Sequence, residues 1–113
     1  MTQFKALVAT IIFSATPVNF GIEGDDTLLG GAGNDVLKGD ADNNPIKTGL
    51  GNDEAFGEDG DDGITNRGGF NEMHGDLGDD TLNAGFEGGI LYCGDGDDSM
   101  TGAHFGLGGA GDD

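Results

Sequence analysis

A nine-residue repeat constrains this chain more than any other feature, because it runs over residues 21–101 without one insertion or deletion. The nine copies read, in order, GIEGDDTLL, GGAGNDVLK, GDADNNPIK, TGLGNDEAF, GEDGDDGIT, NRGGFNEMH, GDLGDDTLN, AGFEGGILY and CGDGDDSMT. An apolar side chain occupies position 8 of every copy: Leu28, Leu37, Ile46, Ala55, Ile64, Met73, Leu82, Leu91 and Met100. A short period with an apolar residue at a fixed place is typical of a solenoid, in which each turn packs on its neighbours.

Each copy divides into a loop part and a strand part. The first six positions are rich in Gly, Asp and Asn, which favour turns, and the last three surround the apolar residue. Side chains alternate across a strand, so position 8 faces inward while positions 7 and 9 face outward. Two copies then form one turn, and two small parallel sheets face each other across the position-8 side chains. The predicted fold is all-β, with stacked strands about 4.8 Å apart.

The copies resemble the G-G-x-G-x-D-x-U-x repeat of the repeats-in-toxin (RTX) family, also called haemolysin-type calcium-binding repeats. Position 6 is Asp in six copies and Asn in two, position 4 is Gly in seven, and copies 6 and 8 depart most from the pattern. The resemblance implies a right-handed parallel β-roll that binds calcium within a larger secreted protein. It also implies export by a type I system that reads an uncleaved C-terminal signal, although no such segment is recognisable in this sequence.

Calcium is coordinated by about six to eight oxygen atoms, from carboxylates and backbone carbonyls. Glycine permits a positive φ that turns carbonyls inward, and the position-6 side chain adds charge. One loop cannot surround the ion, so loops two copies apart are expected to share it. Turn formation alone would not keep Asp at one position. The candidate ligands are Asp26, Asp35, Asn44, Asp53, Asp62, Asn71, Asp80 and Asp98 at position 6, and Gly24, Gly33, Gly51, Gly60, Gly78 and Gly96 at position 4.

Odd copies build one edge of the roll and even copies the other, and most acidic residues fall in the odd copies. One ion is expected between each pair of successive odd copies, the sites shared by copy 3 being weaker because Asn44 replaces Asp. On the even edge, Asp35 and Asp53 form a good pair, but calcium should be lost toward copies 6 and 8. The total is about four to six ions. An apolar strip is expected on the even edge instead, made of Leu50, Phe70, Phe86 and Phe105.

The charge balance limits the possible partners. Asp and Glu total 22 against four Lys and Arg, which gives a formal net charge of −18 at pH 7. Because such a chain repels itself when compact, we expect it to be unfolded without calcium. Nucleic acid and anionic membranes are poor partners for it, and no apolar run is long enough to span a membrane. The expected partners are calcium ions and flanking domains of a longer protein, with the chain monomeric or weakly self-associating.

Catalytic sites and other metal sites have little support. Cys93, the one cysteine, excludes an internal disulfide and is interpreted as a small tolerated residue rather than a reactive thiol. His74 and His104 are the only histidines, so a structural zinc site is not expected, and they do not form an H-E-x-x-H motif. The serines lack a G-x-S-x-G setting, and the loops lack the twelfth-position Glu of an EF-hand. We therefore expect no enzyme activity.

Three regions are predicted: a capping strand region at residues 1–20, the calcium-binding roll at 21–101, and an irregular tenth copy with a truncated loop at 102–113. The apolar run at residues 6–13 fits a strand that caps the first turn, or alternatively a cleaved secretory signal. Pro17 is expected to end that strand, with Val18 and Phe20 leading into the first loop. The truncated loop suggests a piece of a longer protein.

The sequence thus predicts a calcium-binding β-roll module of an extracellular protein, which folds on meeting calcium outside the cell and aids export or acts as a spacer. Two alternatives stay open. An adhesin or ice-binding repeat would need a regular outward array of Thr or Asn, which position 3 does not supply. The other alternative is an acidic, disordered calcium buffer.

Overall fold

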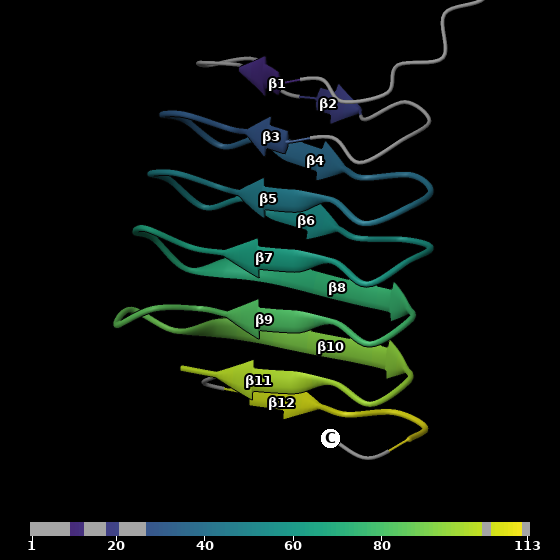
Figure 1. Ribbon diagram of the computed structural model, residues 1–113. Coiled ribbons are helices and arrows are strands. Elements are labelled where there is room, and N and C mark those ends of the chain that lie inside the picture. Colours follow the sequence, from purple (N-terminus) through teal and green to yellow (C-terminus); the bar gives the residue numbers. More distant parts are fainter. Residues whose placement is uncertain (1–9, 13–17, 21–26, 103–104, 112–113) are drawn as a thin grey trace, which may run out of the picture.

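The computed structural model describes residues 10–12, 18–20, 27–102 and 105–111. In this part of the chain, all regular structure is β-strand, arranged as two parallel sheets that face each other (Figure 1). Sheet A contains β1 (Thr10–Ile12), β3 (Thr27–Leu29), β5 (Pro45–Lys47), β7 (Gly63–Thr65), β9 (Thr81–Asn83) and β11 (Ser99–Thr101), in that order. Sheet B contains β2 (Val18–Phe20), β4 (Val36–Lys38), β6 (Glu54–Phe56), β8 (Asn71–Leu77), β10 (Gly89–Asp95) and β12 (Phe105–Leu107), also in sequence order.

The register of both sheets shows that one turn contains two copies of the repeat. In sheet A, Ile46 of copy 3 pairs with Leu28 on one side and with Ile64 on the other. In sheet B, Ala55 of copy 4 pairs in the same way with Leu37. Strands of successive odd copies therefore lie side by side in one sheet, and strands of even copies in the other. This arrangement confirms the predicted parallel β-roll.

The position-8 side chains form the core, as predicted. Those of copies 1 to 8 are at most 1% exposed, and Met100 of copy 9 packs against them while partly buried. Their neighbours at positions 7 and 9 are more exposed, as strand alternation requires. Ala84 and Cys93, both at position 1, also lie in this core. Position 1 therefore faces inward, and the Cys93 thiol is buried rather than displayed on a loop.

Two strands are longer than the predicted three residues. β8 and β10 each contain seven residues, because their pairing continues into the loop of the next copy. There Gly94 pairs with Asp76, and Asp95 with Leu77. The strand and the following loop therefore share one continuous ladder on this part of the roll.

The ends of the described chain extend the two sheets. Thr10–Ile12, which belongs to the apolar run at residues 6–13, is β1 and pairs with β3. Val18 and Phe20, which were expected to lead into the first loop, belong to a further strand, because Val18–Phe20 is β2 and pairs with β4. At the other end, β12 pairs with β10 in a shifted register, Ile90 opposite Phe105, since the sequence after copy 9 is three residues short of the period.

Two glycines provide a matched test of how tightly the turns stack. A Cβ on Gly78, where φ is 114°, would lie 2.0 Å from the carbonyl oxygen of Gly60 in the neighbouring turn, whereas a Cβ on Gly63 meets nothing within 4 Å. We expect Gly78→Ala to lower the free energy of unfolding by more than about 2 kcal/mol, because the backbone and the adjacent turn must both shift. Gly63→Ala should raise it by about 0.5 kcal/mol. Thermal unfolding in excess calcium measures both, and equal effects would contradict this stacking.

Candidate metal centre

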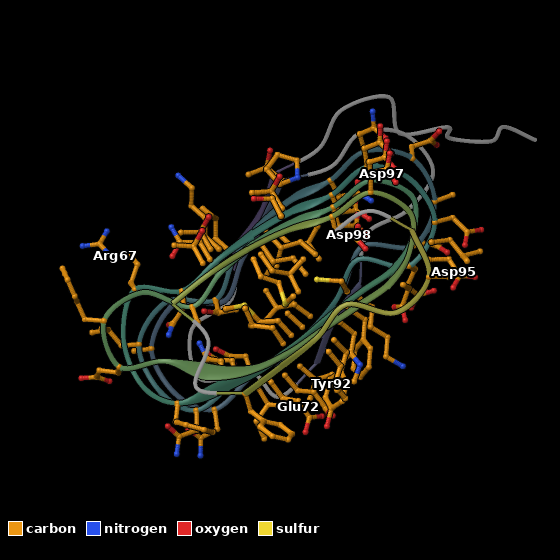
Figure 2. The ribbon with its side chains drawn as sticks, turned by 90° about the horizontal axis from the view of Figure 1, so that it is seen from below. Arg67, Glu72, Tyr92, Asp95, Asp97 and Asp98 are labelled. Carbon is orange, nitrogen blue, oxygen red and sulfur yellow. The ribbon has the colours of Figure 1, made fainter. Side chains whose placement is uncertain are left out.

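The position-6 side chains point into the loops rather than toward solvent. Seven of the predicted ligands are at most 6% exposed: Asp35, Asn44, Asp53, Asp62, Asn71, Asp80 and Asp98. Figure 2 shows the contrast in copy 9, where Asp98 points into the loop while Asp95 and Asp97 lie on its outside. Asp26 and Gly24 lie outside the described residues. The structure therefore gathers the predicted side-chain ligands of copies 2 to 7 and 9 inside the two edges of the roll.

In copies 4 to 7 and 9, one oxygen of the position-6 side chain accepts a hydrogen bond from the backbone of the preceding turn. On the odd edge, the N–H of Asp62 donates to Oδ1 of Asp80 at 2.7 Å, and the N–H of Asp80 donates to Oδ1 of Asp98 at 2.7 Å. On the even edge, the N–H of Asp35 donates to Oδ1 of Asp53 at 2.8 Å. These bonds connect consecutive turns and fix the orientation of each carboxylate.

The second carboxylate oxygen, Oδ2, is buried without a hydrogen-bond partner among the described residues in Asp35, Asp53, Asp62 and Asp80. An unsatisfied buried polar atom costs about 1–3 kcal/mol, and a charged one costs more. These carboxylates come in pairs on successive turns, Asp35 with Asp53 and Asp62 with Asp80. A cation between two turns would satisfy both oxygens of a pair at once.

The pKa values of these carboxyl groups reflect the same lack of partners. Burial raises the pKa of Asp62 and of Asp80 to about 7, and that of Asp53 to about 6. The charge on the adjacent turn contributes to these raised pKa values, with Asp80 acting on Asp62 and Asp35 on Asp53. Burial also raises the pKa of Asp35. The folded chain therefore favours either a proton or a metal ion at these oxygens.

Backbone conformation supplies the other oxygen ligands. The described position-4 glycines that were predicted as ligands have φ values between 107° and 134°: Gly33, Gly51, Gly60, Gly78 and Gly96. At position 2, Asp40, Glu58 and Asp76 also have positive φ, near 75°, where most other copies have Gly. Left-handed residues at alternate positions reverse the direction of successive peptide groups, so carbonyl oxygens of the loop converge on its interior.

Asn44 shows where these carbonyls converge. Its Nδ2 donates to the carbonyl oxygens of Gly39, Ala41 and Asp42, at 3.0, 3.1 and 3.2 Å. The amide thus sits among the carbonyls of positions 1, 3 and 4 of its own loop. In copies with Asp at position 6, a carboxylate takes the place of this amide, and the set becomes all oxygen. Calcium prefers such a set, so the residues present fit this ion.

Neutral side chains fill the C-terminal part of the even edge. Nδ2 of Asn66 donates to the carbonyl oxygens of Gly69 and Ala84, at 3.0 and 2.8 Å, so it bridges copies 6 and 8. The Thr48 hydroxyl lies 3.3 Å from Oδ1 of Asn66 and accepts from Nδ2 of Asn71 at 3.0 Å. This network joins amide, hydroxyl and carbonyl groups, and beside it the Glu87 carboxylate accepts from the N–H of Gly69. The network provides a physical basis for the expected loss of calcium toward copies 6 and 8, which stays a prediction.

The apolar strip predicted for the even edge is wrong. Phe86 is fully exposed and packs on nothing, and Phe105 lies in β12 rather than in a loop. Leu50 and Phe70 are 59% and 45% exposed. The strip does not form because the inward positions 1 and 6 close these loops with amide and hydroxyl groups. The apolar residues at positions 3 and 5 are left facing solvent.

Sequence reasoning missed two groups of residues. It treated position 1 as part of a turn and so overlooked Thr48 and Asn66. The signal was present in the sequence, because these copies have a residue larger than Gly at position 1, and its side chain enters the loop. It also overlooked Glu54, Glu72 and His74 on the outer face of sheet B. Comparing even copies with each other would have placed Glu54 beside Glu72.

A parallel β-roll whose loops gather paired carboxylates and inward carbonyls defines a class of metal-binding repeat module. In agreement with this class, the family model described as "RTX calcium-binding nonapeptide repeat (4 copies)" matches residues 20–53, 39–71 and 67–91. The matches cover more than half of the chain, which therefore belongs to the RTX calcium-binding nonapeptide repeat family and is a calcium-binding module. This repeat is structural and not itself catalytic. No characterised protein and no solved structure matched the chain.

The described residues contain no helix with the length and apolar character needed to cross a membrane.

Calcium binding should compete with protons. Because the pKa of Asp62 and Asp80 is raised to about 7 from an ordinary 3.8, protonation of these groups stabilises the metal-free fold below about pH 4, and this contribution is lost as the pH rises through about 7. Lowering the pH from about 7.5 to about 5 should therefore increase β-structure in EDTA and raise the calcium concentration needed at the folding midpoint. Circular dichroism titrations at the two pH values measure both changes. A pH-independent calcium midpoint would contradict this account.

Asn44→Asp tests whether the amide occupies a cation position. As the calcium concentration is lowered, the variant should lose more stability than the parent, by about 1–3 kcal/mol, because a carboxylate replaces the donor that faces three carbonyls. With excess calcium, it should be more stable than the parent, because the carboxylate becomes a ligand. Asn43→Asp is the matched control, because Asn43 is at the exposed position 5. Its Oδ1 accepts from the N–H of Asp61, and an Asp side chain can keep that bond. Identical calcium responses of the two variants, measured by thermal unfolding, would rule out the assignment.

Proposed function

We propose that this chain is a calcium-dependent folding module of a secreted protein, which folds on reaching a calcium-rich exterior and there aids export or acts as a spacer. The observation that carries the proposal is the set of buried, unpartnered carboxylate oxygens on successive turns. A net charge of −18 adds repulsion that divalent cations would offset. The role is structural, with no enzyme activity.

The proposed calcium ions lie between loops two copies apart. The best sites have a carboxylate in both loops: Asp35 with Asp53 on the even edge, and Asp62 with Asp80 and Asp80 with Asp98 on the odd edge. The sites that share copy 3 are weaker, because Asn44 brings an amide instead of a charge. Between copies 6 and 8, the Asn66 amide takes the place of an ion. The total of about four to six ions includes sites formed by loops outside the described residues.

The outer face of sheet A gives no support to an adhesin or ice-binding array. Its position-7 side chains change from turn to turn, in the order Thr27, Pro45, Gly63, Thr81 and Ser99. A flat array needs the same side chain on every turn. The disordered buffer is the remaining alternative, and a folding measurement separates it from the roll.

The test is a calcium titration of the chain followed by circular dichroism. We expect no cooperative transition in EDTA, and a cooperative gain of β-structure with a midpoint near 10⁻⁴–10⁻³ M, about the affinity of extracellular calcium modules. Asp80→Asn should raise the midpoint on the order of tenfold, equivalent to about 1.4 kcal/mol, because Asp80 serves two sites. A chain that binds calcium but never gains β-structure would be a buffer. A cooperative transition in EDTA would also refute the proposal.

Asp79→Asn is the matched control for this experiment. Asp79 is next in sequence to Asp80 and loses the same charge, but its Oδ1 accepts from the N–H of Asp97 in an exposed position, and Asn can keep that bond. The control should change the midpoint little. If both variants shift it equally, calcium acts through overall charge rather than through the loop sites.

A further inference from the structure

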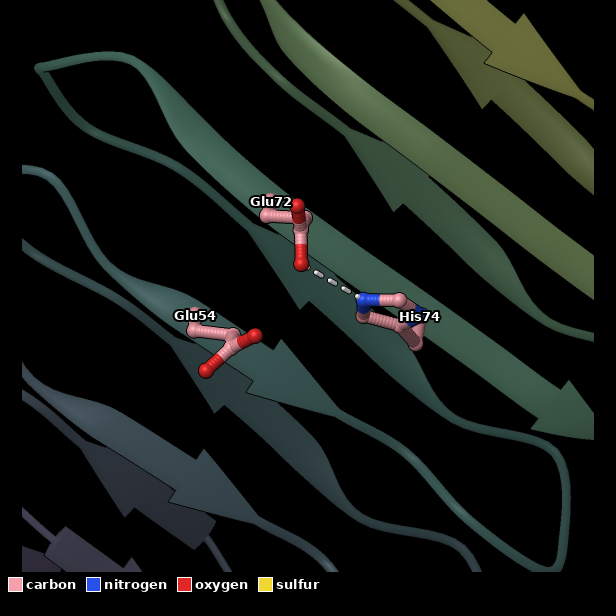
Figure 3. A group of neighbouring side chains, drawn as sticks. All are labelled: Glu54, Glu72 and His74. Carbon is pink, nitrogen blue, oxygen red and sulfur yellow. Dashed lines mark hydrogen bonds and ion pairs between the residues drawn. The ribbon is translucent and has the colours of Figure 1, made fainter.

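The outer face of sheet B carries a group of carboxylates and an imidazole that takes no part in the calcium loops. Glu72 and His74 project from β8, and Glu54 projects from β6 at the register position beside Glu72 (Figure 3). Nε2 of His74 lies 3.0 Å from Oε1 of Glu72. One ligand atom from each of the three side chains lies within 4.8 Å of the other two. The three side chains are partly exposed, so an ion in solution can reach them.

Aromatic stacking holds the imidazole in place. The His74 ring lies between Phe56 and Tyr92, with ring centroids 4.6 Å apart on each side and interplanar angles of 17° and 13°. Both faces of the imidazole are covered, which leaves its edge and Nε2 directed at Glu72. Immobilising a side chain on binding costs about 0.5–1.5 kcal/mol. The two stacked rings already immobilise the His74 side chain in the folded chain, so metal binding does not add this cost for it.

The two glutamates are an unfavourable pair without a cation. Like charges directly opposite each other on neighbouring strands are destabilising, and Glu54 and Glu72 are paired in the parallel register. His74 contacts Glu72. Lys38 is the only Lys or Arg on the described strands of sheet B, and its Nζ lies 5.5 Å from the centre of the Phe56 ring. A divalent ion between the glutamates would offset both charges.

We propose that Glu54, Glu72 and His74 bind a divalent transition-metal ion such as zinc, at a site separate from the calcium loops. Zinc takes imidazole nitrogen and carboxylate oxygen at about 2.0–2.2 Å, so two ligands of one tetrahedral ion lie roughly 3.3–3.6 Å apart. Nε2 of His74 and Oε1 of Glu72, 3.0 Å apart, are within a few tenths of an ångström of this spacing, so small side-chain movements bring all three ligands onto one ion. Calcium binds oxygen ligands, so the imidazole selects against it.

The site differs from a closed structural zinc site. Three protein ligands leave a fourth position open, which water or a side chain from another protein can occupy. The metal therefore gives sheet B a point of attachment on a surface that otherwise repels anionic partners. The site depends on the folded roll, but not on which calcium loops are filled.

The test is isothermal titration of zinc into the chain in excess calcium. We expect one equivalent of zinc to bind, with an affinity that more calcium does not change. His74→Phe should abolish binding, because it keeps an aromatic ring between Phe56 and Tyr92 and removes both nitrogens. Glu54→Gln and Glu72→Gln should each weaken binding by more than the roughly tenfold that loss of an outer-sphere partner causes.

Two control variants separate this site from general charge effects. Glu87→Gln removes the same charge from the even edge, and His104→Phe removes the other histidine, so both should keep zinc binding unchanged. Absence of zinc binding in excess calcium, binding that survives His74→Phe, or equal affinities of Glu54→Gln and Glu87→Gln would overturn the proposal. If circular dichroism shows that His74→Phe has lost β-structure, the comparison of Glu54→Gln with Glu87→Gln decides.

Discussion

The roll depends on burying carboxylates that the protein itself only half satisfies. At position 6, one oxygen of Asp53, Asp62 and Asp80 accepts a backbone N–H from the preceding turn, and the other has no hydrogen-bond partner among the described residues. In Asp35, neither oxygen has such a partner. The glycines at position 4 allow the loop to enclose these oxygens with carbonyl groups. A core of one apolar residue per copy is small for a chain with this much charge. We therefore expect ion binding and folding to be one equilibrium in this module.

The difference between Asp and Asn at one loop position changes what a turn needs. The Asn44 amide donates to three carbonyls and completes its loop, whereas a carboxylate in the same place needs a cation. Asn66 uses its amide in a similar way from position 1. The roll thus combines turns that satisfy themselves with turns that require metal. Composition alone would not separate the two kinds, because Asn and Asp are equally common in turns.

The strands, their pairing and the core could be predicted because position 8 is apolar in every copy and the period never slips. The position-6 side chains could be chosen as candidate ligands from their type, but their burial could not be predicted, since the direction of a loop side chain depends on left-handed residues that do not follow strand alternation. This is also why Thr48 and Asn66 were missed and why the Phe86 strip was wrong. The outer cluster at His74 was missed because Glu54 meets Glu72 and His74 only across strands, two copies away in the sequence.

The hydrogen bonds between position-6 residues of successive turns also give the roll a direction. Each backbone N–H at this position donates to a side chain of the next turn toward the C-terminus, as Asn44 does to Asp62 and Asp62 to Asp80. Every turn is thus supported by the one that follows it. On the odd edge the series continues to Asp98, but on the even edge it ends at Asn71, because Gly89 has no side chain to accept. Fraying of the C-terminal turns removes hydrogen-bond acceptors from their N-terminal neighbours, one turn after another. We therefore expect the roll to unfold progressively from its C-terminal end.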